Sequence, residues 1–172
     1  MDYRIRNLEA DDWQRLFAFE MANRAWFEQH IDPRPDVFYT PQAVRQHVHE
    51  LLEGHAGGSW HPCVIVDGGG AIVGRANLKS IDRTALTAEV GYRVAASHVG
   101  QGLATRALAH LLALARDEWR LRKLTAIVTE DNSASAAVLL KSGFSYVSRL
   151  PAVAVVQASA VDGLIYERAI AG

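Results

Sequence analysis

The sequence predicts a mixed α/β fold of the α+β kind, in which a mostly antiparallel central sheet of about six to seven strands carries helices on both faces. Two observations predict it. The first half of the chain contains short apolar segments separated by turn residues, as in an antiparallel meander, whereas the second half alternates strand-like and helix-like segments. A chain of 172 residues, 49% of them hydrophobic, can bury a sizeable core, and we expect a single domain over residues 1–172.

The N-terminal third is expected to form one strand and two helices. Residues 3–6 alternate in character as a strand does, and Asp11 or Asp12 is placed to cap the helix that follows. Three prolines make residues 31–41 an irregular loop. A second helix follows Thr40, because apolar residues then recur on one face.

The middle of the chain predicts an antiparallel meander. Four short apolar segments are separated by turns rich in glycine and aspartate. The segments are residues 63–66, 71–74, 76–80 and 88–94.

The last third changes to a strand–helix rhythm, because apolar residues there recur at helical spacing between short apolar strands. Glycine at position 143 stops the second of the two helices. The expected elements are a helix over 102–119, a strand over 124–128, a helix over 133–142, and strands over 144–148 and 163–168.

The composition argues against several classes of partner. A formal net charge of −1 offers no basic excess, so no nucleic-acid partner is expected. No apolar run approaches the ~20 residues that span a bilayer, and the N-terminus lacks the apolar core of a signal peptide. We therefore expect a cytoplasmic protein with no membrane partner. The single cysteine, Cys63, cannot form an internal disulfide, and with His61 it fits a buried structural residue better than a nucleophile.

Gly100, Gly102 and Ala104 form the most informative pattern in the chain. They follow the strand expected at 88–94 and open the helix expected at 102–119. A helix N-terminus carries free N–H groups and a partial positive charge, and small residues let a pyrophosphate approach it closely. No Gly-Lys-Ser/Thr follows and an antiparallel meander precedes, which argues against a nucleotide P-loop and a dinucleotide-binding fold. A tight turn that binds nothing is the remaining alternative.

At these residues the sequence resembles the GNAT-type N-acetyltransferase superfamily. The pyrophosphate motif of that family is Gln/Arg-x-x-Gly-x-Gly/Ala. Gly102 and Ala104 occupy its last two defined positions, whereas Val99 departs from the first. Five segments together are similar to the ribosomal-protein-alanine N-acetyltransferase branch. These are residues 23–26, 88–92, 100–105, 130–135 and 142–144.

The resemblance implies a GNAT-like acetyltransferase fold, with acetyl-CoA as the acetyl donor. In such enzymes the strand before the glycine loop splays from its neighbour, and the pantetheine arm pairs with backbone exposed near Val94. The residues expected to contact the coenzyme are Val94, Gly100, Gln101, Gly102, Leu103, Ala104, Thr105 and Asn132.

The acceptor implied by the resemblance is a primary amine, with the α-amine of a protein or peptide N-terminus as first choice. A small-molecule amine, such as an antibiotic or polyamine, is the alternative, and a non-catalytic coenzyme A-binding module is a rival from another class. An α-amine is about 10–20% neutral at pH 7, but a lysine amine is neutral at less than about 0.1%. A general base therefore matters much more for lysine. The sequence leaves the oligomeric state open, and a homodimer is compatible with it.

Glu89 and Ser135 are the candidate catalytic residues. Glu89 lies in the strand before the glycine loop, between apolar neighbours, and could accept the amine proton directly or through water. A surface pair with Arg93 is the alternative. Ser135, which the resemblance places beside the thioester, could protonate the leaving sulfur. Capping of its own helix is the alternative for Ser135, and Tyr146 is a second candidate acid.

Aromatic residues near the proline-rich loop are candidates for the acceptor side. Trp26 and Tyr39 could shape an acceptor groove, or could pack in the core of the two early helices. His47 and His49 lie two apart on a predicted helix and face different ways. We therefore expect no metal site.

Overall fold

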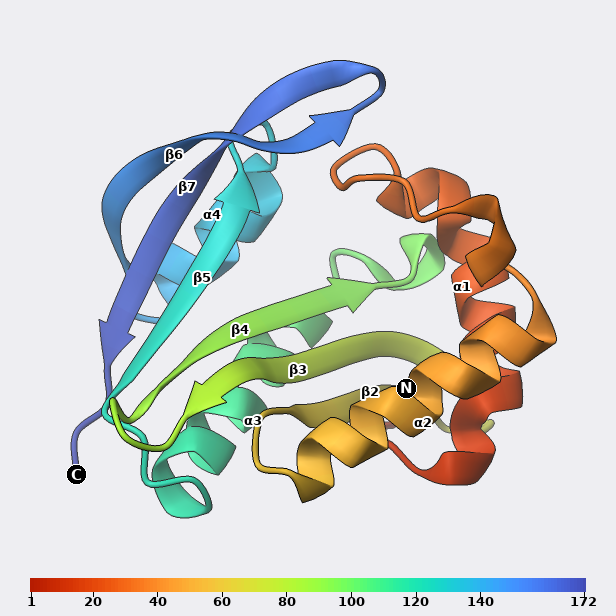
Figure 1. Cartoon of the computed structure of the whole chain (residues 1–172), viewed down its shortest axis with the longest axis horizontal. Helices are drawn as coiled ribbons and strands as arrows, with labels where there is room; N and C mark the ends of the chain where they lie inside the picture. Colours follow the sequence, from red (N-terminus) through yellow and green to blue (C-terminus); the bar gives the residue numbers. More distant parts are fainter.

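The computed structural model describes all 172 residues and contains a seven-stranded sheet with the order β1-β2-β3-β4-β5-β7-β6 (Figure 1). Neighbouring strands are antiparallel except β4 and β5, which are parallel. The predicted mixed, mostly antiparallel sheet is therefore confirmed. The strands are β1 (Tyr3–Asn7), β2 (His61–Asp67), β3 (Ile72–Asp82), β4 (Thr87–Val94), β5 (Lys123–Thr129), β6 (Ser145–Val156) and β7 (Ser159–Ala169).

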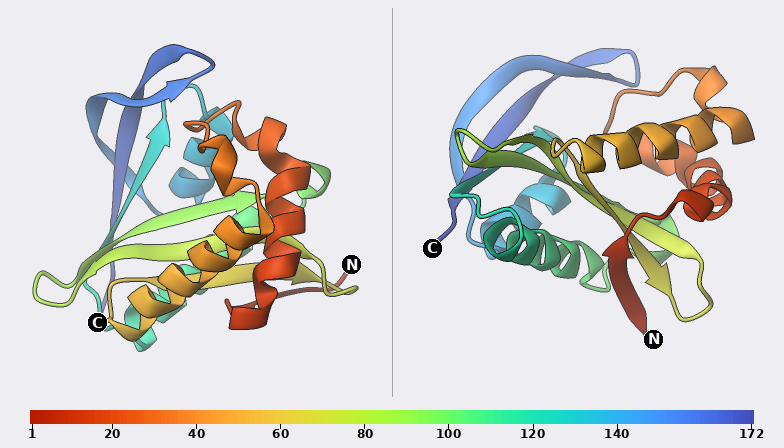
Figure 2. Two further views of the ribbon diagram at one scale, coloured as in Figure 1. Left: turned by 45° about the vertical axis from the view of Figure 1, so that its right-hand side comes forward. Right: turned by 60° about the horizontal axis from the view of Figure 1, so that its bottom comes forward.

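Helices cover both faces of the sheet, as predicted. Figure 2 shows α1 and α2 over one face and α3 and α4 over the other. No helix is both long enough and apolar enough to cross a lipid bilayer. The helices are α1 (Trp13–Phe27), α2 (Pro41–Ala56), α3 (Leu103–Asp117) and α4 (Ser133–Lys141), and the short 3-10 turns are η1 (Ala10–Asp12), η2 (Asp36–Phe38) and η3 (Ala96–His98).

The starts of α1 and α2 follow the predicted residues, with one difference. Thr40 caps α2, because its Oγ1 accepts a hydrogen bond from the backbone N–H of Ala43 at 3.2 Å. Asp12 takes the capping position of α1, but its side chain makes no cap hydrogen bond there. Its buried carboxylate instead pairs with Arg6 at 2.7 Å and with Arg15 at 2.8 Å.

Three strands differ most in length from the predicted ones. The segments expected at 71–74 and 76–80 are one strand, β3, with Gly74 inside it. A Cβ at Gly74 would lie 2.6 Å from Ile65 Cδ1, so this glycine serves close packing rather than a strand end. β6 and β7 extend the two short strands expected at 144–148 and 163–168. β6 tolerates Pro151 because it is an edge strand and its register shifts at this point.

The pairing of β4 with β5 is short. Only three residue pairs join the two strands, and the last of them is Glu89 with Thr125. Beyond Glu89 the strands diverge, as Figure 1 shows, and residues 90–94 have no partner strand on that side. The splay that the resemblance implied is thus present, and Glu89 lies at its apex.

A buried carboxylate fixes α1 to the strands beside this opening. Glu20 of α1 is 1% exposed, and its Oε1 accepts hydrogen bonds from Arg75 of β3 at 2.7 Å and from Arg93 of β4 at 2.8 Å. Next to it, Asn23 Oδ1 accepts from the backbone N–H of Ala96, just after β4. Separating α1 from β4 would leave the buried charge of Glu20 without its partners, which is energetically unfavourable. These contacts therefore hold the end of β4 against α1.

His61 at the start of β2 is fully buried and electrically neutral. Its Nδ1 accepts a hydrogen bond from Trp119 Nε1 at 2.8 Å, and its Nε2 lies 2.7 Å from Asn7 Oδ1, to which it donates. Both ring nitrogens are therefore in use only in the neutral form. Burial, with smaller effects of His55 and His110, lowers the pKa of His61 from 6.5 to about 4.

We predict that acid destabilises the fold through His61. Below pH 6.5 the unfolded chain binds a proton that the folded chain does not bind until about pH 4. The contribution of His61 is thus complete above pH 6.5 and is lost as the pH falls, by about 2 kcal/mol at pH 5. Urea unfolding at pH 7.5 and 5.0 measures this loss. His61→Gln should flatten the pH dependence, and an equal slope in both proteins would contradict the prediction.

Candidate active site

The glycine loop before α3 has the backbone that phosphate binding needs. Gly100 and Gly102 have φ angles of +76° and +74°, which side-chain-bearing residues rarely adopt. A Cβ at either position would meet nothing within 4 Å, so open space lies beside both glycines. Gly102 caps α3 without a side-chain hydrogen bond, which leaves the first N–H groups of the helix free.

This loop borders a cavity of about 400 Å³ that reaches from α3 to α4 and α1. Most residues predicted to contact the coenzyme line it. They are Val94, Gly100, Gly102, Leu103, Ala104, Thr105 and Asn132. The acceptor-side candidate Trp26 and the catalytic candidate Ser135 also line this cavity. Gln101 differs, because its Oε1 accepts a hydrogen bond from the Tyr3 hydroxyl at 2.6 Å and only its backbone remains available to the loop. Val99, the departure from the family motif, also lines the cavity.

Two hydroxyl groups meet at the end of the cavity nearest α4. Asn132 Oδ1 accepts from the backbone N–H of Ser135 at 3.2 Å and so caps this helix. The Ser135 hydroxyl is not used for capping and lies 3.1 Å from the Tyr92 hydroxyl of β4. Burial raises the pKa of Tyr92, so its phenol keeps its proton at neutral pH. Tyr146 is half-exposed, packs against Tyr166 and lies outside the lining of this cavity.

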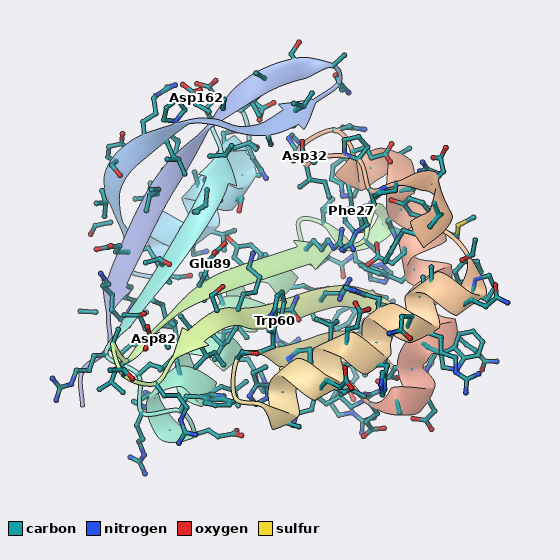
Figure 3. All side chains as sticks on the ribbon, viewed as in Figure 1. Phe27, Asp32, Trp60, Asp82, Glu89 and Asp162 are labelled. Atoms are coloured by element: carbon teal, nitrogen blue, oxygen red, sulfur yellow. The ribbon has the colours of Figure 1, made fainter.

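Glu89 lies on the other side of the opening between β4 and β5. Its Oε1 is 3.0 Å from Lys79 Nζ of β3, whereas Arg93, the partner considered in the sequence, binds Glu20. Gly91 leaves room for this lysine, because a Cβ there would lie 3.2 Å from Lys79 Cε. Glu89 borders a second cavity of about 620 Å³ between β5, the β6–β7 hairpin and the loop after α1. Figure 3 shows Glu89 and Asp32 at the edges of this region.

His30, which the sequence analysis missed, joins the two cavities. It follows α1 and is among the residues that line both of them. Its Nδ1 is buried and has no hydrogen-bond partner, while its carbonyl oxygen accepts from Thr129 Oγ1 of β5 at 3.2 Å. The two cavities therefore share a wall at His30 and are joined in this sense, with Tyr92 and Ser135 lining the first and Glu89 the second. In the sequence, only the position of His30 at the edge of the proline-rich loop could have suggested that it lies at the site.

The two aromatic residues predicted for the acceptor side lie in different places. Trp26 lines the cavity beside the glycine loop, with its ring nearly perpendicular to that of His30. Tyr39 lies outside the lining of both cavities, and the Arg24 guanidinium stacks 4.0 Å above its ring. Tyr39 therefore packs against Arg24 of α1 and does not line either cavity.

Other polar groups of the chain do not form a comparable site. Burial raises the pKa of Cys63 to about 12, which keeps it a thiol. His55, His61 and Glu118 place ligand atoms within 4.8 Å of one another, but both nitrogens of His61 already make hydrogen bonds. No lone pair of His61 is free for a metal ion.

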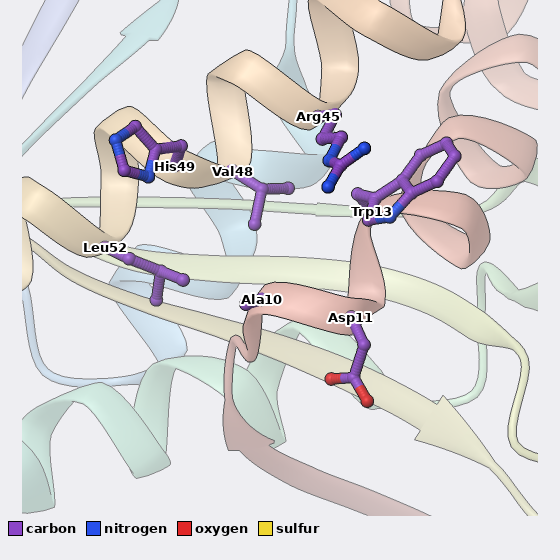
Figure 4. Close-up of a pocket in the computed structure, with 7 residues that line it drawn as sticks. All are labelled: Ala10, Asp11, Trp13, Arg45, Val48, His49 and Leu52. Carbon is purple, nitrogen blue, oxygen red and sulfur yellow. The ribbon is translucent and has the colours of Figure 1, made fainter.

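A further hollow, of about 350 Å³, lies between η1 and α2. Figure 4 shows that Trp13, Arg45 and Leu52 border it. No buried, unpartnered polar atom faces it. We therefore assign the chemistry to the two joined cavities.

Comparisons with known proteins agree with this geometry. The profile of a family described as "Acetyltransferase (GNAT) domain" matches residues 3–145. The curated protein "Probable N-acetyltransferase YjcK" of Bacillus subtilis (strain 168) is 31% identical over 142 residues, which cover 81% of this chain and 78% of that protein.

The fold is similar to several solved structures. Ribosomal-protein-S5-alanine acetyltransferase from Vibrio fischeri superposes with a TM-score of 0.93 at 22% identity, covering 99% of this chain and 94% of that one. Spermidine N-acetyltransferase from Vibrio cholerae, in complex with CoA and spermine, gives a TM-score of 0.82 at 16% identity, covering 98% of this chain and 95% of that one. One fold thus accompanies protein acceptors in one neighbour and polyamine acceptors in another.

We predict that Gly102→Glu abolishes coenzyme A binding. The new carboxylate would fill the open space beside the loop and repel the phosphates, so affinity should fall at least about 100-fold. Gly70→Glu is the matched control, because Gly70 also has a positive φ, of +85°, and lies in a turn away from the cavity. Both variants should lose similar stability, and calorimetry should show binding only in the control. Unchanged binding by a folded Gly102→Glu protein would place the coenzyme elsewhere.

Proposed function

Starting from the fact that this chain belongs to the GNAT acetyltransferase family and is an acetyl-CoA-dependent N-acetyltransferase, we propose that it acetylates the α-amine of a protein or peptide N-terminus. The observation that carries the proposal is the cavity of about 620 Å³ at Glu89. The β6–β7 hairpin and the proline-rich loop after α1 border this cavity, so an extended chain end has room to enter between them.

The coenzyme side of the site fits acetyl-CoA. The free N–H groups at the start of α3 suit the pyrophosphate, and the open side of β4 offers unpaired backbone groups to the pantetheine arm. Bound in this way, the coenzyme supplies the acetyl thioester at the opening between β4 and β5. The acceptor amine then approaches from the side of Glu89.

In the proposed reaction, the amine nitrogen attacks the thioester carbonyl carbon, the C–N bond forms and the C–S bond breaks. Glu89 accepts the proton that the amine loses, directly or through water. Ser135 donates a proton to the leaving sulfur, and the adjacent protonated Tyr92 hydroxyl stabilises Ser135 as it does so. Since an α-amine is already about 10–20% neutral at pH 7, one carboxylate suffices as base.

A small-molecule amine remains the second candidate acceptor, and the polyamine complex of the Vibrio cholerae neighbour supports it. The two candidates differ in what must fit between the hairpin and the loop. A polyamine brings several positive charges to the cavity, whereas a peptide brings one at its N-terminus.

We predict that the protein acetylates peptides with a free N-terminal alanine at the α-amine. The enzyme would be incubated with acetyl-CoA and a panel of peptides and small amines, and products would be sequenced by mass spectrometric fragmentation. Peptides with a blocked N-terminus and an internal lysine are the control. A product marked only on lysine, or formed only from small amines, would reject the N-terminal acceptor.

We predict different pH profiles for Glu89→Gln and Ser135→Ala. The turnover of Glu89→Gln should fall about 5- to 10-fold at pH 7, because only about 10–20% of an α-amine is neutral there, and it should recover as the pH rises above ~8 and the amine deprotonates without help. The loss in Ser135→Ala should persist across this range, because the thiolate still lacks a proton donor. Turnover at saturation with both substrates, measured from pH 6 to 9.5, tests both.

Glu167→Gln is the matched control for the base. Glu167 also pairs with a lysine, Lys123 at 3.2 Å, but it lies on β7 away from both cavities. Its profile should equal that of the wild type. A Glu89→Gln profile parallel to the wild type would remove Glu89 as the base, and His30 would take its place as the candidate.

A further inference from the structure

Arg34 lies in the cavity at Glu89 in an unusual position. It is flanked by Pro33 and Pro35, whose rings fix their own φ angles and restrict the residues before them. The side chain lies over the Phe38 ring, with its guanidinium carbon 4.2 Å from the ring centroid, and it lines the cavity together with Glu89. The loop therefore holds this guanidinium in place at the wall of the acceptor cavity.

No acidic side chain of the protein neutralises Arg34. The carboxylate that acts on it through space is that of Glu20, and this group is already bonded to Arg75 and Arg93. Asp32, which borders the same cavity, instead accepts from the backbone N–H of Val155 in β6. Burial, followed by the nearby charge of Arg75, lowers the pKa of Arg34. The side chain is half-buried, and a partly desolvated guanidinium without an ionic partner favours an incoming anion.

Charges of both signs surround Arg34. Arg34, Arg75 and Arg93 carry three positive charges against the one negative charge of Glu20, a net charge of +2, whereas the cavity wall itself also carries the carboxylates of Asp32 and Glu89. His47 adds none at neutral pH, because burial and the nearby arginines, Arg75 first, lower its pKa to about 3. The carboxylate of Glu89, on the same cavity, attracts positive charge and so suits an amine.

We infer that Arg34 binds a carboxylate of the acceptor while Glu89 receives its amine. The inference rests on the proposed function and narrows it to N-termini with an aspartate or glutamate close behind the reactive residue. Arg donors match a carboxylate in a two-bond arrangement, which fixes orientation as well as affinity. Acceptors without a carboxylate, polyamines included, cannot make these two bonds with Arg34.

The test compares three peptides that differ at one position: Ala-Glu, Ala-Gln and Ala-Lys at the N-terminus of one otherwise constant sequence. For the wild type, KM should be at least about tenfold lower for Ala-Glu than for Ala-Gln, and highest for Ala-Lys. Arg34→Gln should remove the difference between Ala-Glu and Ala-Gln while keeping kcat, since Arg34 does not touch the reacting atoms. Arg34→Glu should reverse the order and favour Ala-Lys.

Arg45→Gln is the matched control, because Arg45 also lies over an aromatic ring, Trp13 at 5.7 Å, but outside both joined cavities. It should keep the wild-type preference. Equal KM values of the wild type for Ala-Glu and Ala-Gln, or a preference that survives Arg34→Gln, would overturn the inference while leaving α-amine acetylation intact.

Two further arms separate this inference from the proposed function. If no peptide reacts, the same comparison is made with glutamate, glutamine and spermidine as acceptors. An Arg34-dependent preference for glutamate would then reject the peptide acceptor and support the carboxylate site, whereas a preference for spermidine would overturn both. Calorimetric titration of the coenzyme A-bound protein with glutamate, glutamine and spermidine compares their affinities without turnover. Equal affinity for glutamate and glutamine would overturn the carboxylate site.

Discussion

The site depends on the limited pairing of β4 with β5. These two parallel strands share only three residue pairs, while each remains paired on its other side along most of its length. The sheet therefore divides without losing its outer ladders, and the unpaired edge of β4 becomes available to a ligand. The helix that connects the two strands, α3, begins beside the same opening, so its free N–H groups lie where the divided sheet leaves room. Glu89 is at the apex because it belongs to the last residue pair.

Polar contacts between distant segments keep the opening in shape. Glu20 joins α1 to β3 and β4, Asn23 holds the chain just after β4, and Tyr92 reaches Ser135 of α4. These contacts approach the end of β4 from both faces of the sheet. Their loss would affect the position of the glycine loop as much as the stability of the protein, because that loop directly follows the fixed segment.

The sequence predicted what depends on local patterns. The glycine loop, the helix after it and the start of α2 after Thr40 could all be predicted from residue type and spacing, and the structure confirms their positions. The prediction failed where a contact between distant residues determines the structure. Gly74 was predicted to end a strand, but it lies inside β3, where a glycine is needed because Ile65 packs against it. The partner of Glu89, the hydroxyl pair of Tyr92 with Ser135, and the junction at His30 are also long-range contacts, and no spacing along the chain reveals them.

The two joined cavities are lined by different elements, one largely by residues of α3, α4 and the end of β4, and the other by residues of β5, β6 and the loop after α1. In the proposed reaction the donor and the acceptor occupy separate cavities, so both can be bound at the same time. Simultaneous binding of both substrates is typical of a ternary complex with direct acetyl transfer, rather than a substituted-enzyme cycle. The one thiol that could carry the acetyl group, Cys63, is buried, which agrees with direct transfer. In steady-state kinetics, this architecture corresponds to intersecting rather than parallel double-reciprocal lines.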